Sequence, residues 1–246
     1  MKLDKNFFID NIKTLFYALI IAILIRSFLV QPFYIPSSSM EPNLLVGDRL
    51  FVSKYSYGYS KHSFPFSPNI FKGRIFFSEP KRGDVVVFKT PADNRTDYIK
   101  RLIALPGDTI QFIDGDLFLN DNQILKTKNN KNLHKIYCGN ILTETHYFDE
   151  KLPNGIVYKA VYHKNDSFKN SDKFLVPEDH YFFLGDNRDC SKDSRYLGSV
   201  GFVKKENLVG KARIIFFSSD YRVGSVFKFW NWKKIIRLKR FFKIIK

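Results

Sequence analysis

Three blocks of polar and reactive residues in this chain together contain what serine-based nucleophilic chemistry needs. The first block, residues 35–42, holds a run of three serines that ends at Ser39. The second block, residues 98–108, contains Lys100, and the third, residues 185–198, mixes serines with charged side chains. A serine hydroxyl is a weak nucleophile until a neighbouring base takes its proton. The first question is therefore which group could act as that base.

Lys100 is the candidate base, because the five histidines are scattered and none stands beside a serine block. In an extended strand Lys100 shares one face with Tyr98 and Leu102, while Ile99 and Arg101 point to the other face. Lowering the pKa of a lysine from about 10.4 towards 7 requires about 4 to 5 kcal/mol, which burial among apolar neighbours can supply. On spacing alone, an ordinary surface lysine is the alternative interpretation.

The cysteines and histidines give no sign of a metal site, and we expect neither a metal nor a cofactor. The histidines form no HExxH or other paired spacing that would place two of them on one helical face. Cys138 and Cys190 are too few for a disulfide framework and do not lie in a metal-ligand spacing. Whether these two cysteines pair with each other is left open.

An apolar stretch near the amino terminus predicts a membrane anchor. Residues 14–25 carry no charge, and residues 28–30 extend the stretch past Arg26 to about seventeen residues, or about 25 Å of helix. A cleaved signal peptide is the alternative, but no small-x-small cleavage site follows the apolar core. Three basic residues come before the span, namely Lys2, Lys5 and Lys13. They predict that the amino terminus stays in the cytosol and that the rest of the chain lies outside.

The net charge of +16 invites a nucleic-acid interpretation, but the location of the charge favours a lipid surface. Nine basic and no acidic residues lie in residues 222–246, interleaved with Trp230 and Trp232. Tryptophan beside lysine and arginine is typical of an anionic lipid interface.

Residues 229–246 also fit an amphipathic helix. Only Lys234 interrupts its apolar face, which holds Trp230, Ile235, Leu238, Phe241, Phe242 and Ile245. A helix packed on the domain with a solvated basic face is the alternative.

The part of the chain after the anchor reads as a mainly β protein with an antiparallel core. Seven short segments are rich in β-branched and aromatic residues and are separated by turn residues, namely residues 49–53, 84–88, 98–105, 109–112, 155–162, 181–184 and 211–217. The predicted organisation is an anchor over 1–30, a β core over 31–113 and 174–225, an inserted β subdomain over 114–173, and a basic tail over 226–246.

Taken together and in order, the blocks resemble bacterial type I signal peptidase, the Ser/Lys leader peptidase family. The resemblance covers residues 26–217 with gaps, and leaves the insert and the basic tail outside. Its matching pieces are Pro36-Ser37-Ser38-Ser39-Met40-Glu41-Pro42, Arg82-Gly83-Asp84-Val85-Val86-Val87-Phe88, Lys100-Arg101-Leu102-Ile103-Ala104-Leu105-Pro106-Gly107-Asp108, and residues 185–198.

The resemblance implies a role for each of several residues. Ser39 would be the nucleophile and Lys100 the general base, and a hydrogen bond between Ser191 and the Lys100 amine would orient that amine. The Ser37 hydroxyl and the Ser39 backbone N–H would form the oxyanion hole. Taken singly, such serines have a simpler interpretation as turn or cap residues.

Two ion pairs would support the site by the same resemblance. Asp193 would pair with Arg195, and Asp186 with Arg101, which would hold the loop and the strand in register. Cys190 stands where the family commonly has asparagine, so the hydrogen bonds of that position are in doubt.

The resemblance also implies the substrate. Proline rules keep residues 33–36 extended, so a peptide could add alongside as a β-strand. Small residues would be accepted at the first and third positions before the cut, which gives a preference for Ala-x-Ala. The implied pocket residues are Phe33, Ile35, Pro36, Met40, Tyr98 and Ile99.

The function that follows is a membrane-bound serine endopeptidase that removes signal peptides from exported preproteins. It would lie in the bacterial cytoplasmic membrane with its catalytic part outside, and its partners would be signal peptides and the lipid bilayer, without nucleic acid. Two alternatives stay open: a Ser/Lys maturation protease dedicated to one exported partner or to itself, and a non-catalytic, membrane-tethered basic binding protein. The oligomeric state stays unknown.

Overall fold

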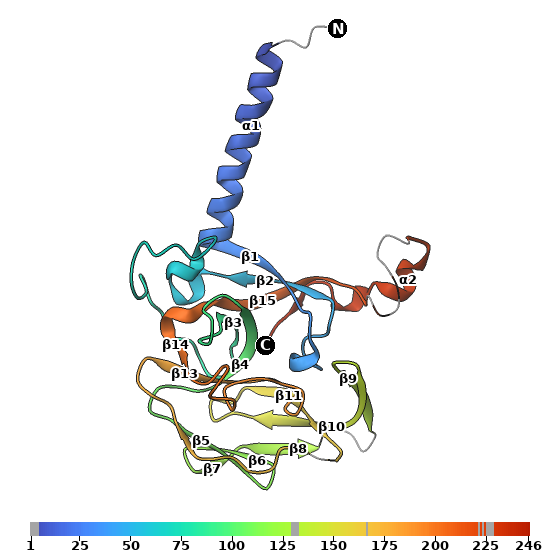
Figure 1. The fold of residues 1–246 in the computed structure, drawn as a ribbon. Coiled ribbons are helices and arrows are strands. Elements are labelled where there is room, and N and C mark those ends of the chain that lie inside the picture. Colours follow the sequence, from blue (N-terminus) through green and yellow to red (C-terminus); the bar gives the residue numbers. More distant parts are fainter. Residues whose placement is uncertain (1–4, 129–132, 166, 221, 223, 225–228) are drawn as a thin grey trace.

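One long apolar helix leads into a body built almost entirely of β-strands (Figure 1). The computed structural model describes residues 5–128, 133–165, 167–220, 222, 224 and 229–246. The helix α1 (Lys5–Leu24) continues into a π-helical turn, Ile25–Leu29. Residues 7–29 are long and apolar enough to cross a membrane, and only 6% of their most apolar part is buried within the chain. This exposure fits the predicted membrane anchor.

The strands form three antiparallel sheets. Their bounds, with those of the second short helix, are β1 (Val30–Tyr34), β2 (Asp48–Ser53), β3 (Val85–Lys89), β4 (Asp97–Ala104), β5 (Thr109–Ile113), β6 (Asp116–Leu119), β7 (Asn122–Gln123), β8 (Leu125–Lys128), β9 (His134–Cys138), β10 (Ile141–Lys151), β11 (Val157–His163), β12 (Phe174–Leu175), β13 (His180–Leu184), β14 (Val203–Lys204), β15 (Leu208–Ser218), α2 (Trp232–Ile235) and β16 (Lys243–Ile244).

The main sheet has the order β1-β2-β15-β3-β4-β13-β14, with β16 added to β15. The long strand β15 shifts register at three places along its pairing with β2 and β3. Such bulges bend a strand and increase its twist. As a result the sheet curls, and the turn that follows β1 contacts β4, although three strands separate β1 from β4 in the sheet.

The curled sheet buries apolar side chains on both faces. Alternation along β3 places Val85 and Val87 in one hydrophobic cluster, while Val86 and Phe88 point into another. A third cluster joins β4 and β13 to the strands of residues 114–173, and includes Ile103, Phe182, Leu117, Leu119 and Tyr158. The predicted insert therefore shares a hydrophobic core with the main sheet.

The predicted mainly β class is confirmed, and each of the seven predicted segments overlaps an observed strand. The strands that the sequence did not reveal are of three kinds. β7, β12, β14 and β16 have two residues each, which is too short for an alternating pattern. β6, β8, β9 and β10 lie in the insert, which was predicted only as a β subdomain. β1 directly follows the apolar helix, and only its end was predicted to be extended.

The predicted amphipathic helix over residues 229–246 is wrong. The structure has a four-residue helix, α2, then a 3₁₀ turn at Leu238–Arg240 and the two-residue strand β16, which pairs with β15. The first residues of the predicted tail, 226–228, lie outside the described residues. A role of this tail at a lipid surface stays a prediction.

Contacts with the main sheet explain why the tail is not one continuous helix. Arg237 donates to the Val46 carbonyl over 2.9 Å, and Arg240 Nε donates to Asp48 Oδ1 over 2.9 Å. Ile245 packs against the cluster beneath β1. A continuous helix would carry these side chains away from their partners, and the isoleucines of the tail have a high strand propensity. Tertiary contacts therefore override the helical period.

The two cysteines, whose pairing the sequence left open, form a disulfide bond. Cys138 ends β9, and Cys190 lies in the loop that follows β13, 52 residues further on. The bond ties the insert to the third sequence block. It also places Cys190 Sγ 3.5 Å from the Ser38 hydroxyl, next to the predicted nucleophile.

Candidate active site

Ser39 lies in a short 3₁₀ turn, Ser38–Met40, which follows β1 and is held from two sides. Below it, the Met40 side chain is fully buried in the cluster beneath β1. Above it, Asn187 donates its backbone N–H to the Ser39 carbonyl over 3.1 Å and its side-chain amide to the Ser38 carbonyl over 3.3 Å. The first and third sequence blocks therefore meet at this turn, which fixes the position of the Ser39 hydroxyl.

Lys100, from the middle of β4, meets Ser39 across the curled sheet. Its Nζ lies 2.6 Å from Ser39 Oγ and 3.0 Å from the Ile99 carbonyl oxygen. Only 3% of the residue is exposed, and the Tyr98 ring lies on the same side, with its centroid 5.4 Å from Nζ. The structure thus brings the predicted nucleophile and base into hydrogen-bonding contact.

Burial lowers the pKa of Lys100 to about 8, because the ammonium loses its hydration. The negative charges of Asp193 and Asp186 raise the pKa and oppose part of this effect. An amine with this pKa is largely unprotonated a little above pH 8. In that form it can accept a proton from the serine hydroxyl that it contacts.

The Ser37 hydroxyl lies 3.3 Å from Ser39 Oγ, on the exposed side of the turn. A donor at this distance from the nucleophile can reach the oxygen of a carbonyl whose carbon is under attack. The same turn carries the Ser39 backbone N–H. The two predicted oxyanion donors are therefore within one turn of the nucleophile.

Ser191 is buried beside the pair, but its predicted hydrogen bond to Lys100 is not formed in the structure. Its Oγ has no hydrogen-bond partner among the described residues. Gly185 allows this close approach, since a Cβ there would lie 2.1 Å from Ser191 Oγ and 2.6 Å from the Ser39 carbonyl oxygen. The hydroxyl is thus next to the site and unpartnered, and its orienting role stays a proposal.

The buried ion pair between Arg101 and Asp186 lies directly behind Lys100. Arg101 Nε and Nη2 contact the two Asp186 oxygens at 2.7 and 2.8 Å, and neither side chain is exposed. Arg101 also donates to the Gly83 and Lys246 carbonyl oxygens, at 2.8 and 3.0 Å. A two-pronged contact fixes a guanidinium in orientation as well as position. The residue after the candidate base is therefore rigidly held.

The second ion pair shapes the loop that carries Ser191. Arg195 Nε lies 2.8 Å from Asp193 Oδ1, and both side chains are buried. Asp193 Oδ2 also accepts the Gly185 backbone N–H over 3.0 Å. This aspartate therefore closes the loop around the buried hydroxyl.

A buried cluster around Arg188 was not predicted from the sequence. Arg188 Nη2 lies 2.7 Å from Glu150 Oε2, and both side chains are 1% exposed. The hydroxyls of Tyr158 and Tyr162 donate to the same carboxylate, at 2.7 and 2.5 Å. Glu150 lies in the insert, so no spacing in the sequence pointed to a partner in the third block. The cluster joins the insert to the third sequence block, residues 185–198.

Removing one partner of this cluster should destabilise the protein strongly. We expect Arg188→Met to lower the free energy of unfolding by about 3–5 kcal/mol, because the Glu150 carboxylate would stay buried without its cation. The measurement is urea unfolding of the full chain in maltoside micelles. The double variant Arg188→Met/Glu150→Met is the control and should be less destabilised than the single variant. Equal losses in both would contradict this account.

The predicted pocket residues divide into three groups. Ile35 and Met40 are buried in the cluster beneath β1, and Phe33 and Ile99 pack against the same cluster from either side. Tyr98 packs against the other face of the sheet, and Pro36 is exposed. Four of the six residues thus belong to, or pack against, one apolar cluster that includes Met40, the residue after Ser39.

Asn43 was missed by the sequence interpretation. Its side-chain amide donates to Asp186 Oδ2 over 2.7 Å and to the Lys159 carbonyl over 2.8 Å. No motif distinguishes it from an ordinary turn asparagine. Within the described ranges, no group of three or more His, Cys, Asp or Glu side chains is arranged to hold a metal ion.

Comparison with known proteins relates this chain to one family. A family model described as "Signal peptidase, peptidase S26" matches residues 8–217. The signal peptidase I of Rickettsia conorii is 43% identical over 92% of this chain and 89% of the relative, and that of Rickettsia prowazekii is 42% identical over 92% of this chain and 90% of the relative.

A crystal structure of a signal peptidase I from Enterococcus faecalis V583 is also similar in sequence. It is 28% identical and covers 55% of this chain and 97% of that chain, with a TM-score of 0.33. The membership rests on the first two findings, since the family model covers most of the chain and the relatives align over nearly its full length. The chain belongs to the signal peptidase family, peptidase family S26.

Proposed function

We propose that this chain is a membrane-anchored serine endopeptidase that removes amino-terminal signal peptides from exported preproteins after Ala-x-Ala-like sites. The observation that carries the proposal is the 2.6 Å contact between Ser39 Oγ and the buried amine of Lys100. A hydroxyl and an amine of lowered pKa at this distance form a nucleophile and its base. Membership of the signal peptidase family supplies the substrate class.

The substrate would bind as an extended strand between β1 and β4. Residues 33–36 supply one wall of the site, and Tyr98 and Ile99 begin the other. Alternate side chains of an extended peptide point the same way. The first and third residues before the cut would therefore face the apolar site around Ile35 and Met40, where bulky side chains would clash.

Acylation follows from the positions of the two reactive groups. The Lys100 amine takes the Ser39 proton as Oγ bonds to the carbonyl carbon, and the carbonyl electron pair moves onto its oxygen. The Ser37 hydroxyl and the Ser39 N–H then donate to that oxyanion. The Lys100 ammonium gives its proton to the leaving nitrogen as the carbon–nitrogen bond breaks. The mature protein leaves with a new amino terminus, and the signal peptide stays as an ester on Ser39.

Deacylation reverses the roles. A water molecule attacks the ester carbonyl while Lys100, again neutral, takes one of its protons. The carbon–oxygen bond to Ser39 breaks, and Oγ recovers a proton from Lys100. The Ser191 hydroxyl, which is buried and has no partner in the described part of the chain, would turn to accept from or donate to Lys100 as the protonation of Lys100 changes.

The location of this activity would be the outer side of the cytoplasmic membrane. Lys2, Lys5 and Lys13 precede the uncharged residues 14–25, and basic residues before a span favour the cytosolic side for the amino terminus. Ser39 follows the end of the helix by ten residues. The nucleophile would therefore act close to the membrane surface, where signal peptides emerge.

The proposal is tested by incubating the detergent-solubilised full chain with one preprotein that carries an Ala-x-Ala site. We expect a single cut directly after the second alanine, read by sequencing the new amino terminus. The matched control replaces that alanine with phenylalanine, which should block cleavage. No cleavage of the first substrate, or equal cleavage of both, would contradict the proposed specificity.

A further inference from the structure

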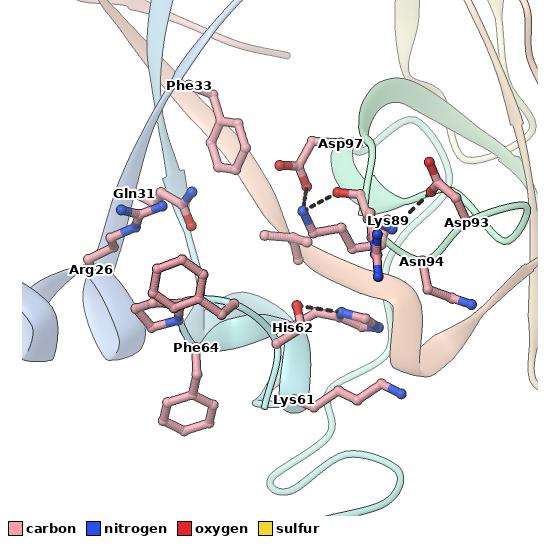
Figure 2. Close-up of a pocket in the computed structure, with 15 residues that line it drawn as sticks. Arg26, Gln31, Phe33, Lys61, His62, Phe64, Lys89, Asp93, Asn94 and Asp97 are labelled. Carbon is pink, nitrogen blue, oxygen red and sulfur yellow. Dashed lines mark hydrogen bonds and ion pairs between the residues drawn. The ribbon is translucent and has the colours of Figure 1, made fainter. Parts of the chain in front are cut away.

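A cavity of about 560 Å³ opens at the foot of α1, beside the sheet (Figure 2). Its walls come from the π-helical turn, from β1, from residues 61–67 and from the turn between β3 and β4. Figure 2 shows Arg26 and Gln31 on one side of it, Lys61 and His62 below, and Lys89 with Asp97 above. The cavity is separate from the Ser39–Lys100 contact.

The cavity carries more positive than negative charge. Four basic side chains line it against two carboxylates, those of Asp93 and Asp97. Lys89 pairs with Asp97 over 2.9 Å, and Asp93 accepts backbone N–H groups of its own turn. The other three basic side chains form no ion pair or hydrogen bond with the described residues, namely Arg26, Lys61 and Arg95. Two positive charges are thus in excess.

His62 adds an unsatisfied polar atom to the same wall. The residue is 4% exposed, its Nδ1 lies 3.0 Å from the Ser67 hydroxyl, and its Nε2 has no partner among the described residues. Burial and the neighbouring cations lower the pKa of His62 to about 4, so the ring is neutral at pH 7. When Ser67 donates to Nδ1, the proton lies on Nε2 and needs an acceptor.

The cavity lies at the level where lipid head groups would surround α1. Arg26 belongs to the last turn of the apolar helix. Phe66 in the cavity wall is exposed, and so are Ile70 and Phe76 in the segment that follows the wall. Phe64 packs edge-on against Phe28 at the foot of the helix. Aromatic residues mixed with arginine and lysine are typical of the membrane interface.

We propose that this cavity binds the phosphate of an anionic membrane lipid, a site that rests on the membrane anchoring proposed above. Arginine guanidinium groups match phosphate oxygens with paired hydrogen bonds, and lysine adds a point charge. The signal peptide is the rival occupant, since Phe33 borders both the cavity and the substrate wall. The segment just before a cleavage site is apolar or small, however, and brings no negative charge to pair with these cations.

The test uses the full chain in lipid-free maltoside micelles, titrated with phosphatidylglycerol and read by native mass spectrometry as bound lipid. The variant Arg26→Gln/Lys61→Gln/Arg95→Gln removes the three unpaired cations. The matched control removes three exposed cations, as Lys128→Gln/Lys151→Gln/Lys169→Gln. Lys128 ends β8 and Lys151 ends β10, two strands far from α1 in Figure 1, and the Lys169 carbonyl accepts from Gly115 in the turn between β5 and β6. We expect the cavity variant to bind the lipid on the order of tenfold to a hundredfold more weakly, and the control to bind as the unsubstituted chain does.

Two further measurements distinguish the phosphate of an anionic lipid from other sources of phosphate. Phosphatidylcholine, which has the phosphate but no net charge, should bind more weakly than phosphatidylglycerol, and inorganic phosphate at the same concentration should not displace the lipid. Equal lipid binding by the cavity and control variants would overturn the proposal, and so would displacement by inorganic phosphate.

Peptide cleavage in lipid-free micelles tests the rival occupant and the fold together. Cleavage of a soluble Ala-x-Ala peptide should be the same in both variants, which also shows that both are folded. A KM raised only in the cavity variant would assign the cavity to the peptide and overturn the lipid site. Because this arm measures activity without lipid, a failed lipid site leaves the proposed peptidase function intact.

Discussion

Ser39→Ala is expected to lower kcat/KM for an Ala-x-Ala peptide by a factor of about a thousand or more. The Ser39 hydroxyl is the one that contacts Lys100, so its loss removes the atom that forms the acyl-enzyme. Stability should change by no more than about 1 kcal/mol, because the hydrogen bonds lost are those to Lys100 and Ser37, and the amine left behind is able to be neutral. Cleavage rates and thermal unfolding of the purified variant measure the two effects.

Ser38→Ala is the matched control for this substitution. Ser38 is the preceding residue and equally buried, but its hydroxyl faces Cys190 and does not contact Lys100. We expect it to keep activity within roughly tenfold of the unsubstituted chain. Substantial cleavage by Ser39→Ala, or equal losses in both variants, would show that Ser39 is not the nucleophile.

Lys100→Met is expected to lower kcat/KM by a comparable factor while making the protein more stable at pH 7. Methionine fills a similar volume but cannot accept the serine proton. It also removes an amine whose burial disfavours the charged form, as the lowered pKa of Lys100 indicates. A loss of activity with a gain in unfolding temperature would separate a catalytic role from a structural one.

The stability gain should depend on pH in a definite direction. Between the folded pKa of about 8 and the ordinary value of 10.5, the unfolded chain binds more protons at Lys100 than the folded chain does. The free energy of unfolding of the unsubstituted chain therefore rises with pH across this window, and the advantage of Lys100→Met shrinks. An advantage that is constant from pH 8 to 10.5 would contradict the assigned pKa.

Lys54 offers a control that is matched in burial. Lys54 is 1% exposed, its pKa is lowered to about 7 by burial, and its Nζ donates to the His62 carbonyl over 3.3 Å. Lys54→Met should therefore also stabilise the protein, yet leave cleavage near its normal rate. If Lys54→Met abolished cleavage as Lys100→Met does, buried lysines in general would be needed for folding. That result would contradict a specific role of Lys100 in cleavage.

Local patterns were sufficient to predict much of the fold. The strand that carries Lys100 has alternating faces, and the structure places Tyr98 and Leu102 in one cluster and Ile99 in another, as the alternation indicated. The apolar helix was also visible as a run of uncharged residues. Strand alternation and an uncharged run both depend on residues that are close together in the chain, so a single sequence contains both signals.

The tail shows where local patterns fail. Its apolar residues have a helical period, but Arg237 and Arg240 find acceptors at Val46 and Asp48, which are almost 200 residues away in the sequence. The same limit applies to the site. The ordered blocks pointed to Ser39, Lys100 and the paired charges, whereas the contacts of Glu150 with Arg188 and of Asn43 with Asp186 depend on how distant segments pack.

The pH dependence of kcat/KM tests the central claim most directly, namely that Lys100 acts as a neutral base on Ser39. Only the unprotonated amine can accept the proton, so activity should rise with pH and level off above a pKa of about 8. At pH 7 roughly a tenth of the amine would be neutral. The same curve should appear in Lys54→Met, which removes the other lysine of lowered pKa. A rise of kcat/KM centred near pH 10.5 would contradict the assignment of Lys100 as the base. So would a rise near pH 7 that disappears in Lys54→Met.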